Sequence, residues 1–566
     1  MAGINTVRMM ALGITLTLSL ASGVVNAQQR PEAAGIEAAV VAGHPLAAAA
    51  GAQVLQRGGN AVDAAITMAG ALAVVRPHMN GVGGDAFMLI YDAKTRQVHA
   101  LNGSGRAGSR ATPALFQQQG LQQVPTYGIL TATVPGAVRA WNDALSRFGT
   151  ITLADALAPG IRYAERGFPL TPKFHGDLTG LIDRVKEDPE LARTYLRNGE
   201  LLKPGELVVQ PDLAQTLRSI AQQGPDALYR GEIAQRITDL MSREGGLLTA
   251  TDLAEHTSTW VDPISTTYHG YQVMAMPPNS QGLALLMQLN MAERLDLKGM
   301  GHNSADYIHR LVEIKKAVFA DRDRYITDPQ FAQIPVQRLL SKEYAAERVR
   351  TLFGNGSARA DVPADPVALR PGSFGSAENW EGDTVYLCAV DKDGNAVVLI
   401  QSLFHFLGSG RVVPGTGILL QNRGASFSLD ASAANVIAPK KRPYHTLTPH
   451  MVLNPDGTPF LLMGTPGGDG QTQTLMQAFN NLVTFGLTPQ AAVEAARWRS
   501  HEDLTLALEP GVPEEVRREL ERRGHTVVVH PPSEEFGGAQ MILIHPVSGA
   551  RIAGADMRRE GTAIAF

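Results

Sequence analysis

The stretch EGDTVYLCAVDKDGNAVVLIQSLF, residues 381–404, constrains the fold most, because it predicts two strands joined by a tight turn. The pair Asp393-Gly394 between the two apolar runs is a hairpin turn signal. Thr384 stands where the first strand begins, directly after Gly382 and Asp383. A threonine there is either an ordinary first residue of a strand or the first residue of a chain that is still to be cut. The rest of the sequence has to decide between these two readings.

The remaining chain predicts an α+β fold with a helix-rich front and a strand-rich back. Residues 36–75 read as two buried helices joined at Gly58-Gly59-Asn60, and apolar residues recur at helical spacing in 284–295 and 304–326. After Thr384, strand and turn patterns cover 417–427, 450–464 and 539–556. Residues 353–379 are polar and rich in Gly, Ala, Pro and Ser, which predicts a poorly ordered segment in front of Thr384.

Charge and cysteine content exclude several classes of protein. The 566-residue chain has a formal net charge of -4, with acidic and basic residues spread along it, so it lacks the basic footprint of a nucleic-acid-binding protein. Its one cysteine, Cys388, excludes an intrachain disulfide and a site of several thiolates on zinc. Cys388 lies in an apolar strand and is predicted to be a small core residue. No metal or organic cofactor is implied.

The N-terminus predicts export. Arg8 precedes an apolar run from Met9 to Leu20, and small residues follow up to Ala27, which is the layout of a secretory signal over residues 1–27. The run is short for a membrane span, although a retained anchor is the alternative. No later segment reaches spanning length, so we expect a secreted or periplasmic mature protein that starts near Gln28 and has no membrane span.

Several common catalytic motifs are absent, and one glycine pair is suggestive. The sequence has no G-x-S-x-G, no H-E-x-x-H and no Walker loop. In MGTPGGDGQTQTL a strand end is followed by Gly467 and Gly468 and then by a helix start. Backbone N–H groups at such a turn suit an oxyanion hole, although a purely structural turn fits as well.

Thr384 could act as a nucleophile only if the chain is cut in front of it. Its own α-amino group would then be free, with a pKa of roughly 7.7–8.0, and could serve as general base for the neighbouring hydroxyl. This chemistry needs no histidine.

Taken together, the motifs resemble the γ-glutamyltranspeptidase family of N-terminal nucleophile hydrolases over nearly the whole mature chain. The matching blocks, in order, are HPLAAAAGAQVLQRGGNAVDAAITMAGALAVVRPHMNGVGGDAFMLIYD, TVPGAVRAW, MPPNSQG, EIKKAVFADRDRYITDP, GDTVYLCAVDKDGNAVVLIQSL, GTGILLQNRGASFS, KRPYHTLTP and GTPGGDGQTQT. The resemblance implies a four-layer αββα sandwich and a proenzyme that cuts itself between Asp383 and Thr384. It also implies a heavy chain of residues 28–383 and a light chain of 384–566 that stay together.

The resemblance also implies roles for individual residues. Thr384 would attack an amide carbonyl and form an acyl-enzyme that passes to water or to an amine. Ser402 matches the second hydroxyl near the nucleophile, and Gly467 and Gly468 match the backbone donors of the oxyanion hole. His445 is expected to line the pocket rather than to act as the base.

The pocket that binds the α-amino and α-carboxylate groups of the substrate in the γ-glutamyl enzymes departs here from the family pattern. Six positions differ from those of the γ-glutamyl enzymes. The arginine of those enzymes corresponds here to Ser104, the asparagine to Phe404, the glutamine to Arg423 and the aspartate to Ser426. Their two serines correspond to His445 and Thr446. Loss of the aspartate removes a partner for a substrate ammonium, whereas Arg423 adds a cation that can bind a carboxylate in a bidentate fork.

Three functions stay open at this point. The first is hydrolysis or transfer of γ-glutamyl groups, as from glutathione, with Arg106 recovering the lost carboxylate contact from a shifted loop. The second keeps the mechanism but takes a dicarboxylic monoamide without the amine, as in glutaryl or cephalosporin-type acylases and oxamate amidohydrolases. The third is an uncut, non-catalytic binding protein. Arg423 could also be part of a structural ion pair.

Overall fold

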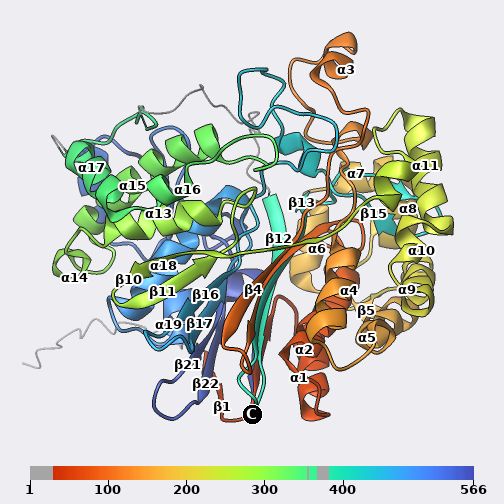
Figure 1. Ribbon diagram of the computed structural model, residues 1–566, viewed down its shortest axis with the longest axis horizontal. Helices are drawn as coiled ribbons and strands as arrows, with labels where there is room; N and C mark the ends of the chain where they lie inside the picture. Colours follow the sequence, from red (N-terminus) through yellow and green to blue (C-terminus); the bar gives the residue numbers. More distant parts are fainter. Residues whose placement is uncertain (1–29, 354–355, 366–381) are drawn as a thin grey trace, which may run out of the picture.

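The computed structural model describes residues 30–353, 356–365 and 382–566 and contains two large antiparallel sheets with helices on both outer sides (Figure 1). The predicted signal segment lies outside the described residues, and so does most of the predicted poorly ordered segment. Within the described ranges, none of the helices combines the length and the apolar character that crossing a membrane requires.

The first sheet carries Thr384 and has seven strands in the order β23-β2-β12-β13-β3-β4-β9. The bounds are β2 Ala39–Ala42, β3 Asp85–Asp92, β4 Gln97–Gly103, β9 Thr259–Val261, β12 Gly382–Val390, β13 Ala396–His405 and β23 Thr562–Ala565. The second sheet has the order β1-β22-β21-β17-β16-β11-β10. Its bounds are β1 Ala33–Gly35, β10 Ile264–Tyr268, β11 Tyr271–Ala275, β16 His450–Leu453, β17 Pro459–Gly464, β21 Gln540–Ile544 and β22 Arg551–Ala555.

Helices cover the outer face of each sheet, on the right and on the left in Figure 1. The first sheet is covered by α1 Pro45–Gln56, α2 Ala61–Val75, α4 Ala137–Phe148, α5 Leu153–Arg166 and α9 Pro211–Gln223. The second is covered by α13 Gly282–Ala292, α15 Ala305–Tyr325, α17 Lys342–Leu352, α18 Gln471–Val483 and α19 Pro489–Glu494.

Three apolar cores hold these layers together. One lies between the first sheet and its helices, one between the second sheet and its helices, and a third between the sheets, where Phe87 and Cys388 from one sheet and Met451 and Leu462 from the other are buried. The side chains of each inner strand alternate between two cores, so both faces of each sheet are apolar. The predicted four-layer αββα sandwich is confirmed, and Cys388 is a core residue as predicted.

Both halves of the chain contribute strands to both sheets. β12 pairs with β2, β13 pairs with β3 and β11 pairs with β16, so residues before and after Thr384 share continuous hydrogen-bond ladders. A cut in front of Thr384 would therefore leave two fragments held by sheet hydrogen bonds and by three common cores. The part of the chain before Thr384 is helix-rich, as predicted, and it also supplies seven strands to the large sheets.

Most predicted elements are present. The two helices around Gly58-Gly59-Asn60 are α1 and α2, with Asn60 as the N-cap of α2, and Asp393-Gly394 joins β12 to β13. The strand and turn patterns predicted over 417–427 are both present, but the strand is short. Only Ile418–Leu419 (β15) is a strand, and Arg423–Ser426 forms a 3₁₀ turn, η2. The Ser426 hydroxyl donates to the Arg423 carbonyl and stabilises that turn instead.

Candidate active site

A β-bulge places Thr384 beside Ser402. Asp383 pairs with Phe404 and Val385 pairs with Gln401, so Ser402 and Leu403 of β13 together face Thr384 of β12. The extra residue turns the two hydroxyl side chains toward one another. Thr384 is 2% exposed and Ser402 is fully buried in this uncut chain.

The two hydroxyls form a chain of hydrogen bonds that ends on the Asp383–Thr384 peptide group. Thr384 Oγ1 donates to Ser402 Oγ at 3.2 Å, and Ser402 Oγ donates to the Asp383 carbonyl oxygen at 2.6 Å. Ser402 Oγ also accepts from the Phe404 N–H at 2.7 Å, and the backbone of Phe404 has a positive φ of 86°. A hydroxyl that donates to a carbonyl oxygen withdraws electron density from the carbonyl carbon, so this peptide group is polarised next to a candidate nucleophile.

Asp383 is held in place by a buried ion pair with Arg559. The Asp383 side chain accepts from Arg559 and, at 2.7 Å, from the Thr384 N–H. Burial raises the pKa of the Asp383 carboxyl, and the Arg559 guanidinium opposes that rise. Arg559 lies close to the C-terminus in sequence and carries no local motif, so sequence reasoning missed it.

The glycine pair packs against β12 as a tight turn. Gly467 (φ 125°) is the N-cap of the 3₁₀ turn η3, Gly468–Gly470, whose first residue Gly468 has a φ of 53°, and α18 begins at Gln471. The Gly468 carbonyl accepts from Gln281 Nε2 at 3.0 Å. The N–H groups of Gly467 and Gly468 have no hydrogen-bond partner within the described residues. They are therefore available to an oxyanion at this helix start.

Arg423 reaches the hydroxyl pair from η2. Its Nη2 lies 3.4 Å from Ser402 Oγ and its Nη1 donates to Thr446 Oγ1 at 3.0 Å. The guanidinium carbon lies 4.0 Å above the centre of the Phe404 ring. Among the residues that the structure describes, no carboxylate forms an ion pair with Arg423, although the side chain is fully buried.

Burial lowers the pKa of Arg423 to about 9, and the nearby Asp85 carboxylate opposes that shift. The side chain is thus a cation at neutral pH. Fully buried charges are normally paired, because desolvation of a lone charge is costly. An anion that entered here would supply the missing partner.

Thr446, Ser426 and His445 have different surroundings. The Thr446 hydroxyl accepts from Arg423, so it faces the site. The Ser426 hydroxyl lies 2.9 Å from the Arg423 and Tyr444 carbonyl oxygens and is occupied by the backbone. His445 is fully buried, with Nε2 3.1 Å from Asp85 Oδ2, and burial lowers its pKa well below the usual range. A neutral imidazole held in this way orients Asp85.

Asp85 is a second residue that sequence reasoning missed. It accepts from Gln421 Nε2 at 2.9 Å and from the Gly105 N–H at 2.8 Å, in addition to its contact with His445. Burial raises the pKa of Asp85 to about 6, with Gln421 and Arg423 opposing the rise. It stands in the glycine-rich stretch NGVGGDAF, residues 80–87, where no catalytic motif marks it.

Ser104 and Arg106 flank Gly105, whose N–H donates to Asp85. The Ser104 hydroxyl accepts from Asn279 Nδ2 at 3.2 Å and is buried among polar side chains. Arg106 is half-buried, and burial lowers its pKa while the Asp328 carboxylate opposes the shift. Arg442, whose Nε donates to the Ser104 carbonyl, is close enough for the Arg106 charge to lower its pKa. The structure does not bring Arg106 into hydrogen-bond contact with Thr384 or Ser402 among the residues described.

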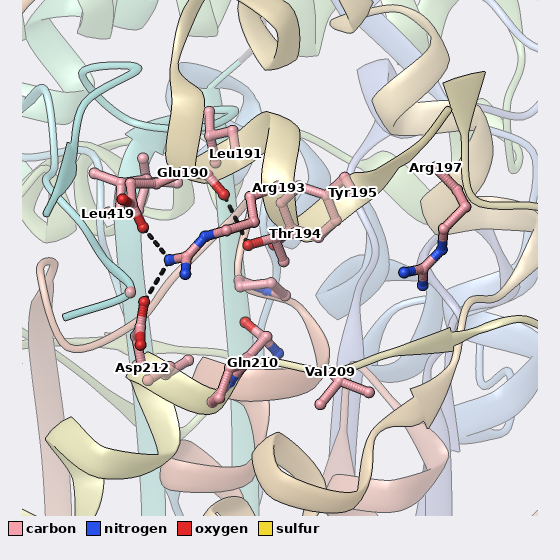
Figure 2. A pocket seen from close by; sticks show the side chains of 15 residues that line it. Glu190, Leu191, Arg193, Thr194, Tyr195, Arg197, Val209, Gln210, Asp212 and Leu419 are labelled. Carbon is pink, nitrogen blue, oxygen red and sulfur yellow. Dashed lines mark hydrogen bonds and ion pairs between the residues drawn. The ribbon is translucent and has the colours of Figure 1, made fainter. Parts of the chain in front are cut away.

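Two other features lie apart from Thr384. A cavity of about 300 Å³ between α8 (Pro189–Tyr195) and the start of α9 is lined by an ion pair of Arg193 with Glu190 and Asp212 and by none of the predicted site residues (Figure 2). The one group of described residues with metal-ligand spacing is His309, Glu313 and His525, in the outer helical layer.

Comparison with known proteins places this geometry in a family. Residues 47–566 match the family model described as "Gamma-glutamyltranspeptidase". The chain is 39% identical to the glutathione hydrolase-like YwrD proenzyme of Bacillus subtilis, covering 94% of this chain and 98% of that protein. It is 36% identical to the acylase ACY 1 proenzyme of Pseudomonas sp. strain SE83, covering 95% of each.

A solved structure agrees with the sequence matches. The cephalosporin acylase from Bacillus halodurans superposes with a TM-score of 0.88 at 38% identity, covering 95% of this chain and 97% of that one. The family model, the full-length relatives and the solved structure all indicate the same family. The chain therefore belongs to the γ-glutamyltranspeptidase family and is an amidohydrolase of that family.

Proposed function

We propose that the protein is a proenzyme that cuts itself between Asp383 and Thr384 and then uses Thr384 as an N-terminal nucleophile. In the first step Thr384 Oγ1 attacks the Asp383 carbonyl carbon and the C–N bond breaks, which moves the Asp383 acyl group from nitrogen to oxygen. Water then hydrolyses the ester. The products are a carboxylate on Asp383 and a free α-amine on Thr384.

In the mature enzyme, the α-amine would take the Thr384 hydroxyl proton as the hydroxyl attacks a substrate amide. An acyl-enzyme ester would form, the amine product would leave with that proton, and water or another amine would accept the acyl group. The contacts of Ser402 with Thr384 Oγ1 and with the Asp383 carbonyl support the first step. The free N–H groups of Gly467 and Gly468 support stabilisation of the oxyanion.

We propose further that the substrate is the monoamide of a dicarboxylic acid. Its acyl group carries a free carboxylate, which binds Arg423, and lacks an α-amine. One observation carries this choice: Arg423 is a buried cation beside Ser402 with no carboxylate ion-paired to it among the described residues. The hydroxyl of Ser426, where the γ-glutamyl enzymes have an aspartate, is occupied by two backbone carbonyls. The two acylase names among the relatives agree with this choice.

Two experiments test the proposal. Intact-mass measurement of the purified protein should give two chains, the lighter one beginning at Thr384, and Thr384→Ala should give one uncut, inactive chain. A variant that still cuts or turns over substrate would refute the mechanism. In calorimetric titrations of the mature enzyme, glutarate should bind more tightly than L-glutamate, because glutamate would bury an unpaired ammonium near Arg423. Tighter binding of glutamate would refute the acyl-group proposal alone.

The second candidate is a γ-glutamyl substrate such as glutathione. Arg106 favours it, since this half-buried cation lies in the block where the γ-glutamyl enzymes keep their carboxylate-binding arginine. The relative named glutathione hydrolase-like favours it as well. In this arrangement the carboxylate would bind Arg106 and the ammonium would need Asp85, whose oxygens already face His445, Gln421 and the Gly105 N–H.

Export is part of the proposal. The signal pattern of residues 1–27 supports a secreted or periplasmic enzyme, with heavy and light chains derived from one precursor. N-terminal sequencing of the protein from its native host should begin near Gln28. A mature chain that begins at Met1 would refute cleavage of the signal.

A further inference from the structure

We propose that His309, Glu313 and His525 bind one divalent transition-metal ion, with zinc as the probe ion, where α15 meets the segment after α20 (Glu514–Arg522). The three ligand atoms all lie within 4.8 Å of one another. Two imidazoles and one carboxylate form a donor set that suits zinc and its neighbours in the first transition series.

The fold brings the three ligands together from two directions. His309 and Glu313 are four residues apart on α15 and therefore lie on one face of the helix. His525 follows α20, where its N–H donates to the Leu520 carbonyl, and it precedes β20, Thr526–Val529. All three residues are buried, with exposed fractions of 3%, 0% and 4%.

The distance between the two histidine nitrogens is close to that in a metal site. His309 Nδ1 and His525 Nε2 are 2.9 Å apart, and their rings meet edge-on. In a tetrahedral zinc site with bonds of about 2.0–2.1 Å, two ligand nitrogens are separated by about 3.3 Å. A side-chain shift of a few tenths of an ångström would open the pair enough to admit an ion.

An unpartnered carboxylate oxygen points to a missing ligand here. Glu313 Oε1 accepts from Lys316 Nζ at 2.9 Å, but its other oxygen, Oε2, has no hydrogen-bond partner among the described residues. A buried carboxylate oxygen without a partner is costly, and an ion bound to Oε2 would remove that cost. A simple histidine–histidine hydrogen bond would leave Oε2 unsatisfied.

The neighbouring charges do not exclude a cation. Lys316 is paired with Glu313, Arg523 is paired with Asp306 at 2.7 Å and with Glu519, and Arg310 lies over the Phe353 ring. His309 also lines a cavity of about 360 Å³, which gives an ion a route from solvent.

The position of the site gives the ion a structural role. His309 and Glu313 precede Thr384 in sequence, whereas His525 follows it. If the proposed cut takes place, the ion would join the two fragments by direct coordination. This consequence rests on the proposed function, but metal binding itself does not.

The test uses the full-length, untagged protein, both wild type and Thr384→Ala, so that binding is measured whether or not the chain is cut. After removal of metals with EDTA, the protein is titrated with ZnCl₂ and with CoCl₂. We expect one zinc per chain, bound tightly enough to survive desalting, and the visible absorption of four-coordinate cobalt. Absence of retained zinc from both proteins would overturn the proposal.

Matched variants locate the site. Glu313→Gln and His525→Gln should each weaken zinc binding by about 100-fold or more, whereas His175→Gln, which removes a histidine from α6 (Pro172–Thr179), should leave it unchanged. Zinc should raise the melting temperature of the wild type and of His175→Gln but not of the two site variants. The metal-free melting temperatures show that each variant is folded. Zinc binding that is equal in all variants would contradict the assignment.

Discussion

The Ser402 hydroxyl donates a 2.6 Å hydrogen bond to the carbonyl oxygen of Asp383, the residue in front of the candidate nucleophile. The same hydroxyl accepts from Thr384 Oγ1, so a single side chain contacts both the attacking oxygen and the carbonyl under attack. The β-bulge between Asp383 and Val385 creates this contact, because a regular ladder would not place Ser402 and Leu403 together opposite Thr384. The geometry is that of a peptide group prepared for attack by its own neighbour.

Ser402→Ala should therefore slow the appearance of the two chains. Loss of one hydrogen-bond donor to a developing oxyanion typically costs about 100- to 1,000-fold in rate. The half-time of cutting can be followed by gel electrophoresis of freshly refolded or newly translated protein. Ser402→Thr keeps a hydroxyl and serves as the control, with a smaller effect. An unchanged half-time in Ser402→Ala would show that this hydrogen bond has no part in cutting.

Arg559→Gln should also slow cutting, through Asp383. Without the guanidinium, burial would raise the pKa of the Asp383 carboxyl further, and the neutral acid would hold the Thr384 N–H less firmly. Arg559→Lys keeps the charge and should recover part of the rate. The diagnostic readout is the pH dependence of cutting, which should shift to higher pH in Arg559→Gln. A uniform loss of rate at all pH values, with Arg559→Lys no better, would indicate a purely structural role.

Arg423→Gln should change which acyl group is accepted. Removal of the cationic partner of a buried carboxylate costs about 100-fold or more in binding. The kcat/KM for glutaryl-p-nitroanilide should fall by that factor, while the value for butyryl-p-nitroanilide, which has no carboxylate, should change little. Arg147→Gln, on α4, is the control for loss of an arginine elsewhere. Equal losses on both substrates would mean that Arg423 supports the fold or the nucleophile and not the carboxylate.

Asp85→Asn should alter how stability depends on pH. Burial raises the pKa of Asp85 to about 6 in the folded chain, whereas an unfolded carboxyl titrates near 3.8. The folded state therefore holds a proton that the unfolded state releases between these values, and this carboxyl lowers the free energy of unfolding as pH rises from about 4 to about 6. Two pKa units correspond to about 3 kcal/mol.

This prediction is best measured on the uncut Thr384→Ala chain, for which unfolding by urea is a single-chain reaction. Between pH 4 and pH 7, the free energy of unfolding of that parent should fall by about 3 kcal/mol more than that of the chain with Asp85→Asn added. Above pH 6 the difference between the two should stay constant. Parallel pH profiles would show that Asp85 is ionised throughout this range in the folded protein.

The resemblance to the family predicted the four layers, and the apolar periodicity predicted individual helices and strands. The helices α1, α2, α13 and α15 and the hairpin β12–β13 all follow local patterns of burial and turn residues. The sequence pattern around Arg423 did not separate strand from turn, because a hydrogen bond from the Ser426 hydroxyl to the backbone stabilises the turn and periodicity does not report such a bond. The short strands of the front half, such as β2 and β9, depend on pairing with distant partners.

The site was predictable only where a motif marks it. Thr384, Ser402 and the glycine pair stand in recognisable blocks, and the structure brings Ser402, Thr446 and Arg423 around Thr384. Asp85 and Arg559 were not predicted, because their roles arise from contacts with residues far away in sequence. Asp85 contacts His445, about 360 residues away, and Arg559 contacts Asp383, about 176 residues away. No local pattern encodes such contacts.

The central claim is that Arg423 selects an acyl group with a carboxylate and without an amine. The most direct measurement compares kcat/KM of the mature enzyme for glutaryl-p-nitroanilide and γ-glutamyl-p-nitroanilide, which differ only in the α-amino group, with Thr384→Ala as the blank. The account predicts that the glutaryl compound is preferred by about 10-fold or more, since the γ-glutamyl compound would bury an ammonium near a buried guanidinium. A clear preference for the γ-glutamyl compound would contradict it and would assign the substrate carboxylate to another cation, with Arg106 the first to examine.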